Sequence, residues 1–118
     1  MSKFRTVISY GNYFEKFLSA LQPRIQDKIF KIIEAIETLE RVPANYLKLI
    51  DGPNQLYEAR IQLGSGQWRV FCFFDEDRLV VLLNGFYKKT QKTPPREIDK
   101  ALTLMHDYYE EKRKIRKK

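Results

Sequence analysis

The residues from Tyr57 to Asn84 constrain the fold of this chain more than any other segment. In Tyr57–Leu63, apolar and polar side chains alternate, which is typical of a half-buried antiparallel strand. A Gly-Ser-Gly turn follows, and then Gln67–Phe74 forms a second run rich in aromatic residues. After an acidic turn, Arg78–Asn84 is apolar on both faces, which indicates a central strand. We therefore predict consecutive antiparallel strands joined by hairpins.

Further secondary structure is expected before these strands. Residues 4–10 are rich in β-forming side chains and predict a short first strand. Asn12 can cap a helix, with Glu15 placed as in a capping box. Pro23 suits the first turn of a second helix, in which isoleucines recur at helical spacing. The two helices are expected to form an α-hairpin that packs on one side of the sheet.

The remaining segments complete the predicted fold. Residues 42–55 contain several breakers and predict a loop. A final amphipathic helix is expected to start near Pro94, and the basic run 112–118 either continues it or frays. The prediction is one domain over residues 1–118, of the α+β (α/β) class. It has an antiparallel sheet of about four strands, an N-terminal helical hairpin and a C-terminal helix.

Composition narrows the classes of function. The chain is 43% hydrophobic and carries a net charge of +7, so it is globular and compatible with a polyanionic partner, although many basic proteins bind none. Cys72 is the single cysteine and His106 the single histidine, which is too few for a zinc site, and we expect no metal and no cofactor. Cys72 lies in an apolar run and reads as a core residue. No apolar run reaches transmembrane length or forms a signal peptide, so we expect a cytoplasmic protein with no membrane contact.

Two arginines, Arg60 and Arg69, interrupt the strand patterns, and the length of the hairpin loop decides whether they share a face. A loop of Gly64-Ser65 places them directly opposite each other, whereas Ser65-Gly66 makes them diagonal neighbours. A three-residue loop would put them on opposite faces. Sequence alone leaves these alternatives open.

A shared face has an electrostatic consequence, because like charges opposite each other destabilise a sheet. An anion such as phosphate between the two arginines would relieve that repulsion. The alternative is an ordinary ion pair in which Glu58 or Glu76 neutralises one of them, and such pairs are the commoner arrangement.

A basic segment follows the third strand directly and holds Lys88, Lys89 and Lys92. Such a cluster suits a phosphate backbone, and the alternative is a solvated loop. Tyr87 adjoins the cluster and could either stack on an unpaired base or pack in the core.

Four motifs together resemble the RelE/HigB superfamily of type II toxin–antitoxin toxins, and the phage-derived HigB-like branch is the most similar. They are a Leu-Tyr-Glu-x-Arg strand at Leu56–Arg60, an Arg-Val-Phe strand at Arg69–Phe71, the segment Gly85–Pro94 and the helix start Glu97–Ala101. The run from Lys88 to Pro94 is the most specific of these. The resemblance implies the RelE-like fold described above.

The resemblance also implies an activity. Members of this superfamily are metal-independent endonucleases that cut mRNA, typically on the ribosome, and a cognate helix-turn-helix antitoxin neutralises them. The 2′-hydroxyl attacks the adjacent phosphate, so the reaction needs charge stabilisation and proton transfer. The alternative is a phage-derived, non-catalytic module on the same fold that binds RNA or protein.

Site residues follow from the resemblance position by position. Arg69 is expected to bind the scissile phosphate, with Arg60 on the same face. Lys88 and Lys89 are expected to contact phosphate or to stabilise the leaving oxygen. Further RNA contacts are expected from Lys48, Tyr87, Lys92 and Arg96. No tyrosine or histidine aligns with the family's C-terminal catalytic position, so the proton-transfer residue stays unassigned.

Overall fold

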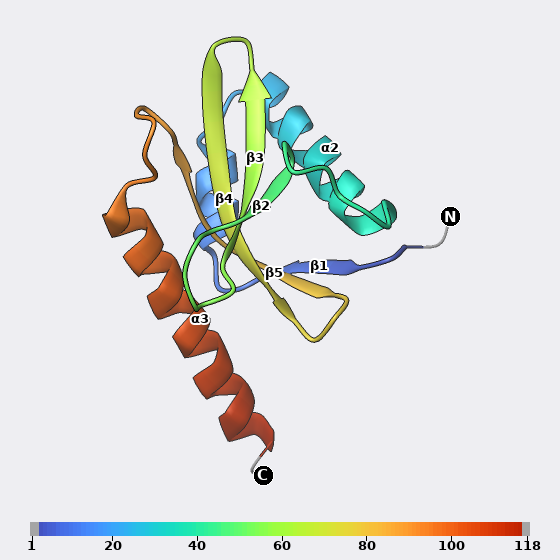
Figure 1. Cartoon of the computed structure of the whole chain (residues 1–118), viewed down its shortest axis with the longest axis vertical. Helices are drawn as coiled ribbons and strands as arrows, with labels where there is room; N and C mark the ends of the chain where they lie inside the picture. Colours follow the sequence, from blue (N-terminus) through green and yellow to red (C-terminus); the bar gives the residue numbers. More distant parts are fainter. Residues whose placement is uncertain (1–2, 117–118) are drawn as a thin grey trace.

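The computed structural model describes residues 3–116 of the chain and contains a five-stranded sheet with helices on both faces (Figure 1). Along the sheet, the strand order is β1-β5-β4-β3-β2. The elements, in chain order, are β1 (Thr6–Ser9), α1 (Tyr13–Ser19), α2 (Pro23–Thr38), β2 (Leu47–Leu49), β3 (Tyr57–Leu63), β4 (Gly66–Asp75), β5 (Leu79–Tyr87) and α3 (Pro95–Arg116).

The antiparallel meander of β3, β4 and β5 confirms the central prediction, and the α+β class holds. The sheet has five strands, one more than the expected number of about four, and it is mixed, so the prediction of an antiparallel sheet is wrong for one strand pair. Leu47–Leu49, inside the predicted loop, pairs antiparallel with β3 at one edge, and β1 pairs parallel with β5 at the other. Both short strands satisfy backbone groups that the outer meander strands would otherwise leave unpaired.

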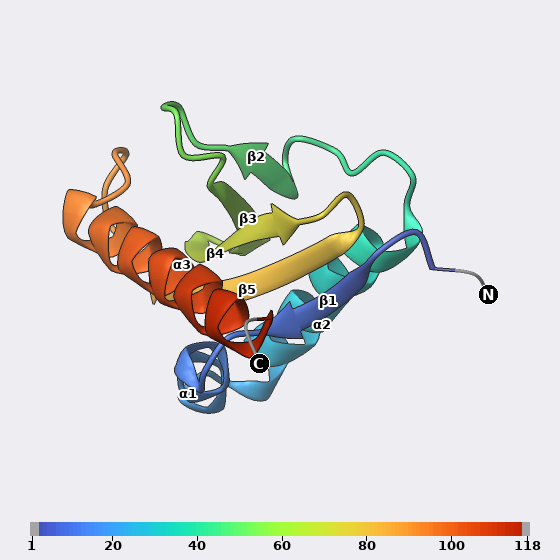
Figure 2. The ribbon, with the colours of Figure 1, turned by 90° about the horizontal axis from the view of Figure 1, so that it is seen from below.

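The helices form two layers, one on each face of the sheet, as Figure 2 shows. The α1–α2 hairpin covers one face, as predicted, and packs Phe14 and the α2 isoleucines against β3, β4 and β5. Helix α3 covers the other face, where Ala101 and Leu104 meet Phe71 and Phe73 of β4. Strand β4 is therefore buried on both sides, which explains the unbroken apolar run Val70–Phe74 within it.

Two local predictions have opposite outcomes. Cys72 lies at the centre of β4 and is fully buried, and burial raises the pKa of its thiol to about 12, so the core prediction is confirmed. The capping-box prediction for α1 is wrong. The Asn12 side chain makes no capping hydrogen bond, and Glu15 instead accepts a hydrogen bond from the hydroxyl of Ser9 in β1.

Helix α3 extends well beyond the sheet, and its second half is tied to the end of β4. Asp75 accepts hydrogen bonds from the Tyr108 hydroxyl at 2.7 Å and from Lys112 Nζ at 2.6 Å. The helix continues through the predicted basic run to Arg116, and residues 117–118 lie outside the described part. Within residues 3–116, no helix has the length and apolar character needed to cross a membrane.

Candidate functional site

The β3–β4 hairpin settles the register that the sequence left open. Leu63 pairs with Gly66, so the loop is Gly64-Ser65, and Gly64 adopts the positive φ (60°) that such a turn requires. Arg60 and Arg69 are consequently direct cross-strand partners on one face of the sheet. This is the face that α3 covers further along the strands.

Arg69 lies in the floor of this region, enclosed by protein groups. Its Nε is 3.0 Å from Glu58 Oε2, and the two side chains are only 3% and 7% exposed. This separation is an ion-pair distance, although the N–H direction is poor for a hydrogen bond. The terminal nitrogens donate to the Trp68 carbonyl (3.1 Å) and to Gln67 Oε1 (2.7 Å). The ion-pair alternative is thus confirmed for Glu58.

Glu76, the other acid considered, lies elsewhere. Its carboxylate is 3.7 Å from Lys112 and 3.7 Å from Arg116, both near the end of α3. Arg60 is half-buried, and within residues 3–116 its side chain forms no ion pair. The two facing arginines therefore differ, because only Arg69 has an anionic partner.

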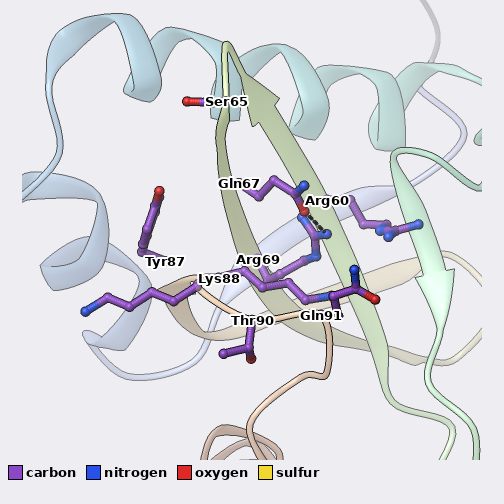
Figure 3. Close-up of a pocket in the computed structure, with 9 residues that line it drawn as sticks. Arg60, Ser65, Gln67, Arg69, Tyr87, Lys88, Thr90 and Gln91 are labelled. Atoms are coloured by element: carbon purple, nitrogen blue, oxygen red, sulfur yellow. Dashed lines mark hydrogen bonds between the residues drawn. The ribbon is translucent and has the colours of Figure 1, made fainter.

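The arginine face opens into a cleft of about 660 Å³ between the β3–β4 hairpin and the segment after β5 (Figure 3). We call this the cationic cleft. Its lining residues are Arg60, Ser65, Gln67, Arg69, Tyr87, Lys88, Lys89, Thr90 and Gln91. The lining brings together all the residues predicted to be catalytic, and no acidic side chain is among the described residues that line it. A smaller cavity of about 160 Å³ adjoins it and shares both arginines and Gln67.

Lys88 is a cation of the cleft whose pKa is lowered by its surroundings. Its backbone N–H donates to the Gln67 carbonyl at 2.8 Å, which fixes the start of the loop against β4. Partial burial lowers the pKa of Lys88, and the positive charges of Arg69, Arg60 and Lys48 lower it further. The nearby carboxylate of Glu58 opposes this effect.

The predicted RNA-contacting residues are more dispersed. Tyr87 lines the cleft, is 47% exposed and packs edge-on against Trp68 with ring centres 5.3 Å apart. Lys48 lies across from Glu58 on β2, and Lys92 and Arg96 are exposed beyond the cleft. None of these three lysine and arginine side chains lines the cleft, although Lys48 is close enough to affect Lys88.

Gln67 is the residue that the sequence analysis missed. It lines both cavities, and its side-chain oxygen accepts a hydrogen bond from Arg69 (Figure 3). Its position two residues before Arg69 already put it on the arginine face, but a neutral amide carries no charge signal. Within residues 3–116, no group of His, Cys, Asp and Glu side chains is arranged to hold a metal ion.

Comparison with known families decides the family of the chain. The family described as "Phage derived protein Gp49-like (DUF891)" matches residues 16–106. The chain belongs to this Gp49-like family. The match covers the end of α1, all of α2, the meander, the cationic cleft and the first half of α3. The resemblance to RelE/HigB toxins, drawn from motifs in the same region, is therefore confirmed at the level of the family.

A solved structure shows the same fold. The archaeal RelE–RelB complex from Pyrococcus horikoshii OT3 contains a chain that is 20% identical to this Gp49-like protein and superposes with a TM-score of 0.54. The alignment covers 71% of this chain and 94% of that chain. A search among curated proteins found no match. The Gp49-like protein is thus RelE-like in fold.

Proposed function

We propose that this protein is the toxin of a type II toxin–antitoxin pair and that it cuts mRNA on the ribosome, which inhibits translation. The observation that carries the proposal is the cationic cleft, where Arg60, Arg69, Lys88 and Lys89 converge without an acidic lining residue among those described. A polyanionic backbone is the ligand class that such a surface favours. Membership of a family related to RelE/HigB toxins supports RNA as the polyanion.

The chemistry of the cleft fits cleavage by the adjacent 2′-hydroxyl. A bond forms between O2′ and phosphorus while the bond from phosphorus to O5′ breaks, which leaves a cyclic phosphate and a 5′-hydroxyl. Arg60 and Lys89 would hold the non-bridging oxygens, whose negative charge grows in the transition state. Lys88 would donate its proton to the departing O5′, since its lowered pKa makes it a better acid than an ordinary lysine. The 2′-hydroxyl would lose its proton to water.

Arg69 takes a different part in this proposal from the one that the sequence predicts. Glu58, the Trp68 carbonyl and Gln67 occupy positions around all three of its nitrogens. Direct phosphate binding is therefore better suited to Arg60, which has no such enclosure. We assign Arg69 the role of a fixed charge in the cleft floor, and Tyr87 that of a platform for an unpaired base.

An antitoxin partner is part of the same proposal. The similar solved structure is a complex of RelE with RelB, and that likeness supports a cognate antitoxin for this chain. The helix-turn-helix type of antitoxin follows from the HigB-like resemblance. Translating ribosomes would place the activity in the cytoplasm.

The test is expression of the protein and of its Arg60→Ala variant. We expect growth arrest with the parent protein, release of arrest with Arg60→Ala, and cleavage of message when purified protein meets translating ribosomes. An exposed Lys31→Ala substitution on α2 serves as the matched control and should retain toxicity. Toxicity that survives Arg60→Ala unchanged would contradict the assigned cleft.

The second candidate is a module that binds RNA but does not cut it. The Glu58–Arg69 ion pair favours this alternative, since it removes one cation from direct contact with substrate. Retained ribosome binding together with intact message, in the same assay, would support it over the nuclease.

A further inference from the structure

Glu58 is a buried acid that lies under the cationic cleft without lining it. It precedes Arg60 by two positions on β3 and therefore points to the same face of the sheet. Its cross-strand neighbours are Phe71 on β4 and Lys48 on β2. The carboxylate is thus enclosed between strands and directed at the guanidinium of Arg69.

Stability alone does not explain a buried ion pair at this position. Removing two charges from water costs several kcal/mol per ion, and apolar residues of similar volume are often as stabilising as the pair. The pair here also lacks good hydrogen-bond geometry, as Glu58 Oε2 and Arg69 Nε have no well-aligned partner. Its position beside the proposed reaction centre offers a different explanation.

The charges that act on Lys88 come from three strands, β2, β3 and β4. Lys48 belongs to β2, Glu58 and Arg60 to β3, and Arg69 to β4, while Lys89 follows Lys88 in the chain. Of the described charged groups that alter the pKa of Lys88, Glu58 is the only anion. Without it, cations alone would surround Lys88, and the protonated form would be harder to maintain.

We propose that Glu58 is a positioning residue of the cationic cleft, whose carboxylate fixes Arg69 in the floor and balances the positive charge around Lys88. This role rests on the proposed nuclease function. Glu58 touches no substrate. It acts through Arg69, by fixing a positive charge in place, and through space on Lys88, by keeping that side chain charged and ready to donate a proton.

The test is a pH titration of the Lys88 side chain by NMR on lysine-labelled protein, with the Lys88→Arg variant identifying the signal. We expect Glu58→Gln to move the Lys88 midpoint to lower pH. Glu58→Asp keeps the charge, so its Lys88 midpoint should lie close to that of the parent protein. The alkaline limb of the RNA-cleavage profile should move in the same direction. Glu34→Gln, an identical change on the exposed face of α2, is the control and should move neither.

The two proposals fail separately in this design. A Lys88 midpoint that is the same in Glu58→Gln and in the parent protein overturns the role of Glu58, as does an equal shift in Glu58→Asp. Absence of cleavage by the parent protein at every pH overturns the nuclease function, while the NMR titration still decides the role of Glu58.

A second comparison covers the case in which Glu58→Gln does not fold. The double variant Glu58→Gln, Arg69→Gln carries no buried charge at this position. Its Lys88 midpoint should lie below that of Arg69→Gln alone, because only the single variant keeps the carboxylate. Equal midpoints in these two proteins would overturn the proposal.

Discussion

Arg60 and Arg69 face each other across neighbouring strands, yet only Arg69 has a buried anionic partner. The two arginines look equivalent in the sequence, but the Arg69 side chain is buried in the protein interior, where it pairs with Glu58. The other keeps its charge available on the cleft surface. This asymmetry gives the two arginines different consequences when they are replaced.

Arg69→Ala is expected to lower the free energy of unfolding by about 3–5 kcal/mol, because it leaves Glu58 buried without a counter-ion. The Arg60 side chain is half-exposed and has no ion-pair partner among the described residues. Arg60→Ala should therefore lower the free energy of unfolding by less than about 1 kcal/mol. Urea unfolding of both variants measures the difference. Equal losses of stability would contradict the asymmetry of the two arginines. Loss of toxicity in Arg69→Ala therefore has to be read together with its stability.

Lys88→Arg is expected to keep the positive charge of the cleft but to lose the proton donor, since arginine does not deprotonate in this range. Cleavage should fall by about 10²–10⁴-fold while RNA binding is retained. In the parent protein, activity should be present below the lowered pKa of Lys88 and decline as the pH rises through it. Single-turnover cleavage across a pH series measures both effects. An unchanged alkaline limb in Lys88→Arg would exclude Lys88 as the donor.

Lys89 and Lys92 offer a paired test of the cleft boundary, because only Lys89 lines it. Lys89→Ala should weaken binding to single-stranded RNA and reduce the slope of log affinity against log salt by about 0.7. Lys92→Ala should have the smaller effect. Fluorescence anisotropy at several salt concentrations gives the slopes. A larger change from Lys92 would place the backbone path outside the cationic cleft.

Asp75 should make the attachment of α3 dependent on pH. Burial alone would raise the pKa of Asp75, but hydrogen bonds from Lys112 and Tyr108 outweigh it, so the pKa in the folded protein is lowered. The stabilisation from Asp75 is therefore complete when the pH is above the pKa of an aspartate in the unfolded chain, about 3.9. It is lost as the pH falls through the lower pKa that Asp75 has in the folded protein. Asp75→Asn should cost about 1.5–3 kcal/mol at pH 7 and progressively less in acid. Chemical unfolding at pH 7 and at about pH 3 tests this, and a difference that does not shrink would refute it.

Gly85 should resist substitution because of a close approach between β5 and α1. A Cβ atom at this position would lie 2.5 Å from the Cδ2 atom of the Phe17 ring. Gly85→Ala should destabilise the protein by about 1–3 kcal/mol through overpacking. The double variant Gly85→Ala, Phe17→Leu should recover part of that loss, as thermal unfolding can show. Failure of the smaller side chain to compensate would mean that the strain arises elsewhere.

The parts of the fold that could be predicted from the sequence depend on local patterns. The alternation in β3 and the helical spacing in α2 each report which face of the element is buried, and the apolar run of β5 reports burial on both faces. Strand β2 could not be predicted, because three residues hold no readable period and its partner Ala59 is distant in sequence. The parallel pairing of Thr6 with Leu79 likewise depends on a distant partner.

The candidate site shows the same division. By itself, the sequence determined that cations lie on a strand pair and on the loop after it, and restricted Arg60 and Arg69 to one face or two according to loop length. Only the tertiary structure decided that the loop is Gly64-Ser65 and that Glu58 is the partner of Arg69. The reason is physical: residue type and periodicity report charge and side-chain direction, whereas the depth at which a charge is buried depends on packing between strands far apart in the sequence.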